Sequence, residues 1–344
     1  MRLMKKVLLL VVATAITAAA QDNAPVNINF EARGDYQRDY VDGETVKDNT
    51  GFKGQYFNIE AYGNITGRFS YYFKHRLNKS TLDSHFFDAT EQLHLDYQFD
   101  DHFSLSAGKQ VVAIGGMEYY RAPIDLYYCS QFWNNIACYE WGVSASYATA
   151  GNRDRFTVQF CESPFAEHFE TSDAYGYSLL WSGRHSWFKS EWSVNLFEIR
   201  PGHFINYIAL GNSFDLGDKV TVELDYLNRA SSHQTFLFKD CTVVGEVGYR
   251  PSNHFRLHAK ASYDVNRSGT DADLTVADGT EVTRLGAGIE YYPLGTPDIR
   301  LHAAYAYSWG TNTDPAPAVL DKQSYIDVGL SWKVDLLKLF KLKN

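Results

Sequence analysis

The chain has 344 residues, a formal net charge of −9 and a mean hydropathy of −0.33, although 45% of its residues are hydrophobic. No stretch after residue 20 approaches the ~18 consecutive apolar residues of a membrane-spanning helix, and the acidic balance excludes a strongly basic nucleic-acid surface. A polar average with 15% aromatic residues is typical of a transmembrane β-barrel, in which only every second strand residue meets lipid.

The first twenty residues predict a secretory signal peptide. Arg2, Lys5 and Lys6 precede an apolar run, and small residues follow up to Ala20. The apolar run is too short to span a membrane, as is usual in signal peptides. Cleavage after Ala20 would remove three basic residues and change the net charge from −9 to −12.

Alternation of apolar and polar residues with a period of two recurs along nearly the whole remaining chain, which predicts β-strands. The predicted strands are Val26–Tyr40, Phe52–Asn64, Arg68–Asn78, Phe87–Phe99, Phe103–Val112, Cys138–Tyr147, Phe156–Phe160, Tyr177–Trp181, Trp192–Leu196, Phe204–Phe214, Val220–Tyr226, Val243–Val247, Phe255–Tyr263, Leu285–Tyr291, Ile299–Tyr305 and Ile326–Trp332. The fold class is therefore an all-β transmembrane antiparallel barrel of about sixteen strands, wide enough to enclose water.

The predicted connections alternate between short and long, as they do in outer-membrane barrels. Short turns are expected near Ile65, Asp100, Asn152, Gly183, Gly217, Pro251 and Gly295, on the periplasmic side with both termini. Long outer loops are expected near residues 40–51, 79–85, 113–136, 163–171, 198–203, 229–238, 266–281 and 309–321.

The third long connection, residues 113–136, is unusually long and rich in tyrosine. Gly115 and Gly116 permit a sharp change of direction, and Pro123 stiffens the middle of the segment. We expect this loop to fold into the barrel and narrow the channel, the alternative being a flap or plug above the rim. The predicted constriction residues are Glu118, Tyr119, Tyr120, Arg121, Asp125, Tyr127 and Tyr128.

In a pore, function depends on the charge and width of the lining. The polar rows of the strands supply the predicted lining residues Arg68, Lys74, Arg76, His94, Arg155, Arg256, His258, Lys260, Arg284, Arg300, His302, Glu60, Glu140, Glu191, Glu223, Asp225, Glu246, Glu290 and Asp327. These charges either form opposed clusters that set a transverse field or pair with one another along the wall. Lys109 falls on a lipid-facing row, so we expect a β-bulge just before the long loop.

Four cysteines are present, and Cys129 and Cys138 bracket eight residues at the end of the long loop. A disulfide between them is permitted in an exported protein, the alternative being free buried thiols. No Cys or His spacing indicates a metal site, and no cofactor is expected.

Two other classes of function are weaker interpretations. An outer-membrane enzyme would need a catalytic cluster, and the outer-loop residues His85, His168, His203 and His233, near Asp83, Glu170 and Ser231, show no triad-like spacing. An adhesin or receptor would act through outer loops such as Asn266–Glu281, which reads as a solvated cap.

The run from Gly108 to Trp133 resembles porins of Bacteroidetes-type bacteria that are grouped with the phosphate-selective porin O/P family. The resemblance is carried by Gly108, Lys109, Gln110, Gly115, Gly116, Glu118, Pro123, Ile124, Asp125 and Tyr127. It implies a sixteen-stranded barrel, usually a homotrimer, whose third outer loop forms the constriction. The chain departs from the phosphate-specific pattern, because the loop contains Arg121 but no lysine after Lys109.

We therefore predict a passive outer-membrane porin for small hydrophilic solutes or ions in a Gram-negative bacterium, with an anion- or phosphate-selective channel as the alternative. The expected partners are outer-membrane lipid, lipopolysaccharide and two further copies of the chain, and no nucleic acid. The expected parts are a signal peptide at 1–20, the barrel at 21–334 and a C-terminal tail at 335–344.

Overall fold

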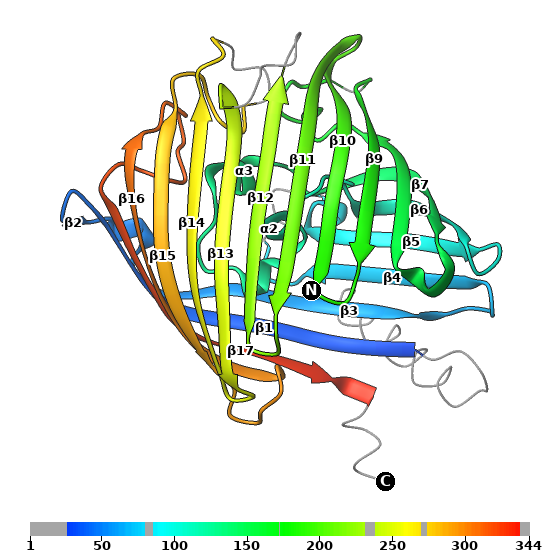
Figure 1. The fold of residues 1–344 in the computed structure, drawn as a ribbon, viewed down its shortest axis with the longest axis horizontal. Helices are drawn as coiled ribbons and strands as arrows, with labels where there is room; N and C mark the ends of the chain where they lie inside the picture. The colour runs from blue at the N-terminus through cyan, green and yellow to red at the C-terminus, as the bar shows by residue number, and fades with distance from the viewer. Residues whose placement is uncertain (1–25, 80–84, 172, 231–237, 270–273, 338–344) are drawn as a thin grey trace.

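The computed structural model describes residues 26–79, 85–171, 173–230, 238–269 and 274–337. In these residues an antiparallel sheet closes on itself, because β1 (Val26–Val41) pairs with both β3 (Gly51–Asn64) and β17 (Gln323–Asp335). β2 (Glu44–Thr45) is a two-residue strand that pairs only with the end of β1 (Figure 1). Sixteen long strands therefore form the wall, and the predicted barrel is confirmed.

The other strands each pair with their neighbours in sequence. They are β4 (Phe69–Arg76), β5 (Thr90–Gln98), β6 (Phe103–Val111), β7 (Tyr139–Ala148), β8 (Asp154–Glu162), β9 (Tyr175–Arg184), β10 (Phe188–Arg200), β11 (His203–Leu216), β12 (Val220–Ala230), β13 (Asp240–Ser252), β14 (Phe255–Asn266), β15 (Glu281–Tyr291) and β16 (Ile299–Thr311).

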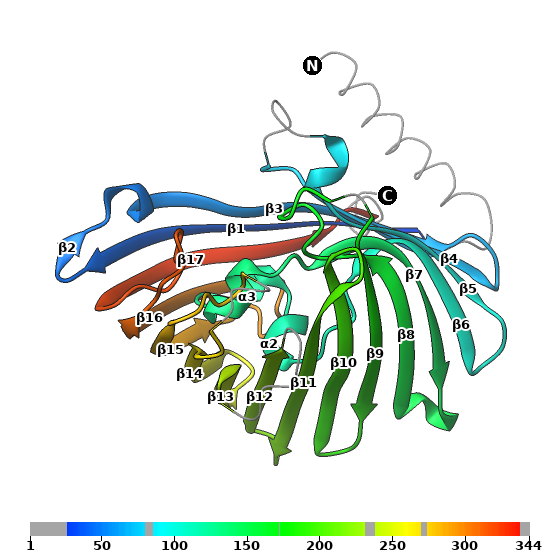
Figure 2. The same cartoon turned by 90° about the horizontal axis from the view of Figure 1, so that it is seen from above.

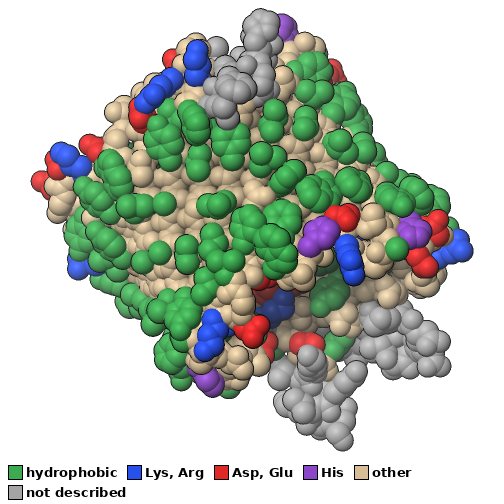
Figure 3. Space-filling model, viewed as in Figure 1, with side chains coloured by type: hydrophobic (Ala, Val, Ile, Leu, Met, Phe, Trp, Pro, Cys, Tyr) green, Lys and Arg blue, Asp and Glu red, His purple; other side chains and the backbone are tan. Residues whose placement is uncertain are grey.

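The wall is apolar outside and polar inside. On β14, Phe255 and Leu257 are each 41% exposed, whereas His258 and Lys260 are 7% and 6% exposed. The exposed side chains form a broad hydrophobic surface over the strands (Figure 3). Closure suits a membrane, because lipid offers no hydrogen bonds to a free strand edge.

The connections alternate in length with one exception. The connection near 198–203 was predicted to be long, but β10 and β11 are joined by the two residues 201–202. This prediction was wrong because both strands run further than their alternation suggested. The turns predicted near Gly183 and Pro251 lie slightly later, at residues 185–187 and 253–254, for the same reason.

The helices that lie wholly within the described ranges are short and belong to the connections: η1 (Lys47–Asn49), η2 (Phe86–Ala89), α2 (Met117–Tyr120), η3 (Pro123–Asp125), α3 (Gln131–Asn135) and η4 (Ala150–Asn152). Within the described ranges, no helix is long and apolar enough to cross a membrane. Three of the helices, α2, η3 and α3, belong to residues 112–138, which we call the inward loop. α2 and α3 lie inside the ring of strands (Figure 2).

An apolar core lies inside the barrel, between the inward loop and one side of the wall. Tyr119 and Phe132 of the loop pack against Phe197 of β10 and against Ile205 and Tyr207 of β11. Burial of these side chains fixes the loop on the β10–β12 side. It also explains why the alternation is weak along β11, whose inward residues meet the loop instead of water.

Candidate functional site

Glycines let the inward loop lie directly on the wall. A Cβ atom at Gly115 would lie 2.4 Å from the Glu191 carbonyl oxygen of β10, and one at Gly211 of β11 would lie 2.6 Å from the Cα atom of Gly116. Gly116 has a φ of +124°, which side-chain-bearing residues rarely adopt. The two loop glycines therefore turn the chain inward, and Gly211 makes room for it.

Buried carboxylates hold the next part of the loop. Asp225 of β12 accepts hydrogen bonds from the backbone N–H groups of Met117 and Glu118, both at 2.7 Å. Glu118 in turn forms an ion pair with Lys260 at 2.5 Å and accepts a hydrogen bond from the Ser130 hydroxyl. Glu118, predicted for the constriction, and Asp225 and Lys260, predicted for the pore lining, are thus anchors of the loop.

The tip of the inward loop completes a chain of alternating charges along β12–β16. Each of its three arginines lies between two carboxylates, as in the pairs Arg256–Glu246 at 2.7 Å and Arg300–Asp125 at 2.7 Å. The order is Glu223, Arg121, Glu246, Arg256, Glu290, Arg300, Asp125. Four acids and three bases make the chain nearly neutral. These contacts favour pairing along the wall over opposed clusters.

A second charged cluster lies on the β1–β5 side. Lys74 is within 4 Å of the carboxylates of Glu31, Glu60 and Glu91. Lys333 of β17 pairs with Glu31 and Glu60 as well, at 2.6 and 3.2 Å. The acids of this wall are therefore compensated by lysines on neighbouring strands.

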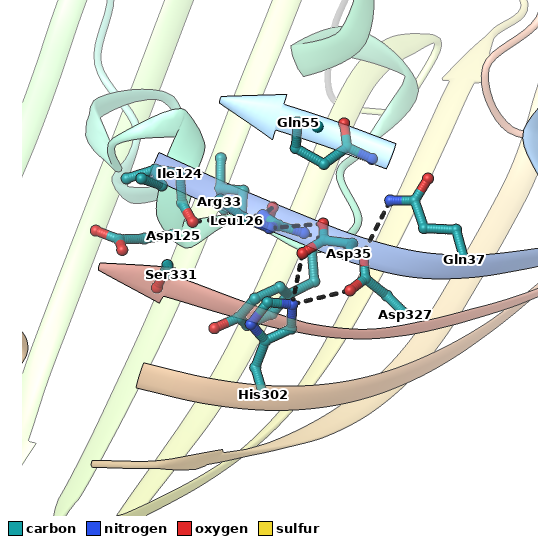
Figure 4. A network of polar contacts seen from close by, with 12 residues as sticks. Arg33, Asp35, Gln37, Gln55, Ile124, Asp125, Leu126, His302, Asp327 and Ser331 are labelled. Atoms are coloured by element: carbon teal, nitrogen blue, oxygen red, sulfur yellow. Dashed lines mark hydrogen bonds and ion pairs between the residues drawn. The ribbon is translucent and has the colours of Figure 1, made fainter. Parts of the chain in front are cut away.

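Arg33 of β1 ties the middle of the loop to the wall (Figure 4). Its guanidinium donates to the backbone carbonyls of Ile124 and Leu126 and also pairs with Asp35 and Asp327 at 2.8 and 3.0 Å. The imidazole of His302 lies 3.2 and 2.9 Å from the same two carboxylates. All these side chains are buried, so the network fixes the loop in place.

Asp35, His302 and Asp327 also form the one group in the described chain whose ligand atoms lie close enough to hold a metal ion. Arg33 already compensates both carboxylates, and the second nitrogen of His302 has no partner among the described residues. Metal-binding histidines normally donate that second N–H to a carboxylate or carbonyl. The contacts therefore fit loop anchoring better than metal binding.

The tyrosines predicted for the constriction have different surroundings. Tyr119 is buried in the apolar core, and Tyr120 is 38% exposed to the lumen. Tyr127 donates to Glu290 and stacks on His302 with ring centroids 4.4 Å apart. Tyr128 is buried, and its backbone carbonyl accepts from Lys260. Among these four tyrosines, Tyr120 alone is exposed and the other three are buried.

Some predicted lining residues lie away from the loop. Arg68 is exposed in the turn before β4, and its guanidinium donates to the hydroxyl of Tyr97, whose ring contacts that of the outward-facing Phe69. Its assignment to the lining was therefore wrong. Arg155 is exposed near the start of β8, and His94 pairs with Asp96 on β5. Arg76 and Arg284 face inward and donate to backbone carbonyls, Arg76 to Gln55 and Arg284 to Cys129.

The remaining predicted acids lie on the inner wall. Glu191 accepts from Ser182 at 2.5 Å and pairs with Arg184, while Glu140 lies at the start of β7, next to the base of the loop.

The structure decides two local questions, in favour of free thiols and against the predicted β-bulge. Cys129 and Cys138 are free thiols. Burial raises the pKa of each thiol to about 12, so both remain protonated. No β-bulge precedes the loop, since β6 keeps its register with β5 and β7. The ammonium of Lys109 instead donates a hydrogen bond to the Phe87 carbonyl oxygen at 3.0 Å, and Trp141 of β7 is the cross-strand neighbour of Lys109.

Water-accessible cavities lie on both sides of the loop. Two cavities of 460 and 720 Å³ share Tyr120, Arg121, Asp125 and Arg300 in their lining. The larger reaches the periplasmic turns, as its lining residue Lys219 shows. A third cavity of 290 Å³ lies between the loop and the outer ends of β1 and β17. These four residues, together with Pro297 of the turn between β15 and β16, therefore border both of the larger cavities.

Sequence reasoning missed most of β1. Glu31 belongs to the β1–β5 cluster, and Arg33 and Asp35 belong to the network that holds the loop, yet none was singled out. A signal was present, because every second residue from Asn27 to Asp39 is polar.

Comparison with known proteins now identifies the chain. Residues 26–187, slightly under half of the chain, match the family model "Phosphate-selective porin O and P". The chain is an outer-membrane porin. The predicted resemblance is thus confirmed, while the bacterial group stays a prediction. A comparison with curated protein sequences finds no significant match.

Solved structures support the porin fold. The in-vitro folded trimer form of OmpT from Vibrio cholerae has a TM-score of 0.61 and 13% identity, covering 91% of this chain and 100% of that one. The anion-selective porin from Comamonas acidovorans has a TM-score of 0.63 and 9% identity, with 91% of this chain and 100% of that one covered. The outer-membrane channel DcaP of Acinetobacter baumannii has a TM-score of 0.62 and 12% identity, with 91% of this chain and 98% of that one covered. At these identities the likeness concerns the fold alone.

Proposed function

We propose that the porin is a weakly selective diffusion channel whose narrow part is formed by Tyr120, Arg121, Asp125 and Arg300. The observation that carries this proposal is the chain of alternating charges. Each of its arginines is balanced by carboxylates within the same wall, so neither an anion nor a cation meets a run of like charge. A small hydrophilic solute of either charge can replace part of its hydration shell with contacts to these charged groups.

The charges around the cavities agree with weak selectivity. Seven basic and six acidic residues line the 720 Å³ cavity, and four basic and three acidic residues line the 460 Å³ cavity. The slight excess of base keeps mild anion preference as the second candidate, in line with the family name and with the printed description of the Comamonas acidovorans porin.

Single-channel recording in planar bilayers tests both candidates. We expect discrete conductance steps and a reversal potential close to zero in a gradient of potassium chloride, with a small displacement toward chloride. A reversal potential near the chloride limit would replace weak selectivity with anion selectivity. Absence of conductance in correctly folded protein would refute the channel.

The assembly and its surroundings remain proposals. We propose a homotrimer, supported by the trimer form of the OmpT structure, with lipid and lipopolysaccharide around its outer wall. The signal peptide at 1–20 lies outside the described residues. β17 runs to Asp335, and residues 338–344 of the predicted tail lie outside the described residues. Cross-linking in native outer membranes tests the trimer, and N-terminal sequencing tests the cleavage.

We propose no catalytic role for the outer-loop histidines. The His85 side chain caps the short helix η2 together with Asp88, which is a local structural role, and the ring of His168 contacts Phe169. Asp83, Ser231 and His233 lie outside the described residues. Hydrolytic activity that is lost on His85→Ala or His168→Ala would overturn this proposal. The adhesin interpretation of Asn266–Glu281 has no further support from the described contacts.

A further inference from the structure

Aromatic side chains line the 460 Å³ cavity beside the inward loop. Tyr72, Tyr120, Trp133 and Tyr139 contribute to this lining, and each of them is half-buried or exposed. Trp133 also lines the 290 Å³ cavity, and Tyr120 also lines the 720 Å³ cavity. A solute that moves along the three cavities therefore passes an aromatic side chain on either side of the 460 Å³ cavity.

Neighbouring side chains hold two of these rings in place. The Tyr72 ring stacks between those of Tyr62 and His94, with centroid distances of 5.9 and 5.7 Å. The Tyr120 ring lies edge-on to that of Tyr119, which is buried in the apolar core. Because these rings are already ordered, a solute that packs on them loses little free energy to the ordering of side chains.

The seven charged side chains of the lining all take part in ion pairs. The pairs are Lys74–Glu31, Lys74–Glu60, Lys333–Glu31, Lys333–Glu60, Arg121–Glu223, Arg121–Glu246, Arg300–Asp125 and Arg300–Glu290. The lining itself has one more base than acid, and the acids that pair with its arginines from outside the lining offset this difference. An ion of either sign therefore meets no uncompensated charge in this cavity, which favours a neutral solute.

Paired charges still offer hydrogen bonds to a solute. Asp125 and Lys333 are the most accessible charged residues of the lining, with 44% and 42% of their side chains exposed. Asp125 Oδ1 accepts from Arg300, whereas its Oδ2 accepts from no described residue. Lys333 donates to Glu31 and Glu60, which leaves the third N–H of its ammonium group. The cavity therefore presents an open acceptor and an open donor.

The open acceptor and the open donor lie on the same part of the wall. Arg300 of β16 donates to Asp125 at 2.7 Å and to the hydroxyl of Ser331 at 3.0 Å. Ser331 precedes Lys333 by two residues on β17, so their side chains face the same side of the sheet about 7 Å apart. One small solute can therefore reach both groups.

Aromatic faces beside paired donors and acceptors suit a sugar. A sugar ring carries C–H groups on its faces, which pack on aromatic rings, and hydroxyls around its edge, each of which both donates and accepts hydrogen bonds. An apolar solute would displace water from the charged groups without replacing its hydrogen bonds, which costs free energy. The volume of 460 Å³ also lies within the ~300–1,000 Å³ typical of small-molecule sites.

We propose that the 460 Å³ cavity binds neutral sugars as they pass through the channel. The sugar ring packs on Tyr120, one hydroxyl donates to Asp125 and another accepts from Lys333. This assignment names a solute class for the proposed channel and so rests on that function.

Current block in planar bilayers tests the proposal, with glucose as the added solute. We expect a saturable decrease of the potassium chloride current. The half-blocking concentration should rise about fivefold to tenfold in Tyr120→Ala, because the contact with the ring is lost. Tyr120→Phe keeps the ring and should restore most of the block.

Two lysines provide a matched pair of variants. Lys333 and Lys189 both pair with acids and have 42% and 43% of their side chains exposed, but Lys189 lines the 720 Å³ cavity and not the 460 Å³ cavity. Lys333→Gln should raise the half-blocking concentration about tenfold, because a hydrogen bond from a charged donor is lost. Lys189→Gln should leave it unchanged, and equal weakening in both variants would overturn the site.

Two other solutes distinguish the chemistry. Sorbitol has hydroxyls without a ring face and should block only at higher concentrations than glucose. Glucuronate adds a negative charge to the ring and should block no more strongly than glucose. Equal block by sorbitol, stronger block by glucuronate, or unchanged block in both Tyr120→Ala and Lys333→Gln would overturn the site. A channel that conducts potassium chloride but is unaffected by glucose would refute this site alone, whereas absence of conductance would refute the channel itself.

Discussion

Removal of the charge of Arg121 is the most direct test of the proposed narrow part. Arg121 reaches from the inward loop to Glu223 of β12 and Glu246 of β13, and no other described loop residue forms an ion pair with either of these carboxylates. Arg121→Gln keeps a polar side chain and leaves Glu223 without an arginine partner. The chain of alternating charges then has four acids and two bases.

The size of the effect follows from Coulomb's law. One unit charge about 4 Å from a passing ion contributes about 1 kcal/mol in water. Loss of the positive charge therefore favours a cation about fivefold and disfavours an anion about fivefold. Salt screens this effect, since the Debye length is about 10 Å at 0.1 M and about 3 Å at 1 M.

The assay is the reversal potential in potassium chloride gradients around 0.1 M and around 1 M. We expect Arg121→Gln to move it toward potassium at low salt and much less at high salt. Arg121→Lys keeps the charge and should stay near the wild-type value, whereas Glu223→Gln should move the potential toward chloride. An unchanged reversal potential at low salt in a conducting Arg121→Gln channel would show that Arg121 does not face the ion pathway.

Three further predictions concern the loop and its thiols. Arg33→Gln breaks a buried ion-pair network, a change that typically costs about 3–5 kcal/mol. The variant should free the inward loop and raise the noise of the open-channel current. Recordings as quiet as those of the wild-type channel would contradict the anchoring role of Arg33. Gly211→Ala places a Cβ atom 2.6 Å from the loop backbone and should therefore alter the conductance. The control Gly248→Ala has no neighbour nearer than 3.4 Å to its new Cβ atom and should leave the conductance unchanged. Identical conductance in the two variants would contradict the close packing of the loop on β11. Cys129 and Cys138 should resist maleimide in the folded barrel, because buried thiols with a raised pKa form little thiolate. After denaturation both should react without any reductant. If a reductant is needed, the two residues form a disulfide and the assignment as free thiols is wrong.

The barrel could be read from the sequence because alternation reports directly on the two environments of each strand. Phe255 and Leu257 face outward and Arg256 and His258 face inward, as the pattern requires. The prediction from alternation failed where inward-facing side chains meet the loop instead of water. Ile205 and other inward residues of β11 pack on the loop, so the polar half of the alternation is missing there and the end of β10 was taken for a loop.

The inward loop could be located from its length and glycines, but its contacts could not. The partners of Arg121 lie 102 and 125 residues further along the chain, and only the closed barrel brings them together. Nearness in sequence was misleading for the thiols. The Cys129 carbonyl accepts from Arg284 of β15, whereas Cys138 lies at the base of the loop beside Val112, so the two residues belong to different parts of the loop.

The position of the apolar core determines where solutes can pass. Because the loop packs on β10–β12, open space is left beside it, where Lys74 and Glu60 line the 460 Å³ cavity, and toward the periplasm, where Glu191 and Glu223 line the 720 Å³ cavity. The loop presents Arg121 and Asp125 to both cavities, so the charge around the loop tip depends on the loop and on both charged walls together. Substitutions in the apolar core should therefore shift the width of the pathway, whereas substitutions in the charged walls should change its preference for ions. The two properties are separable in this barrel because different faces of the same loop control them.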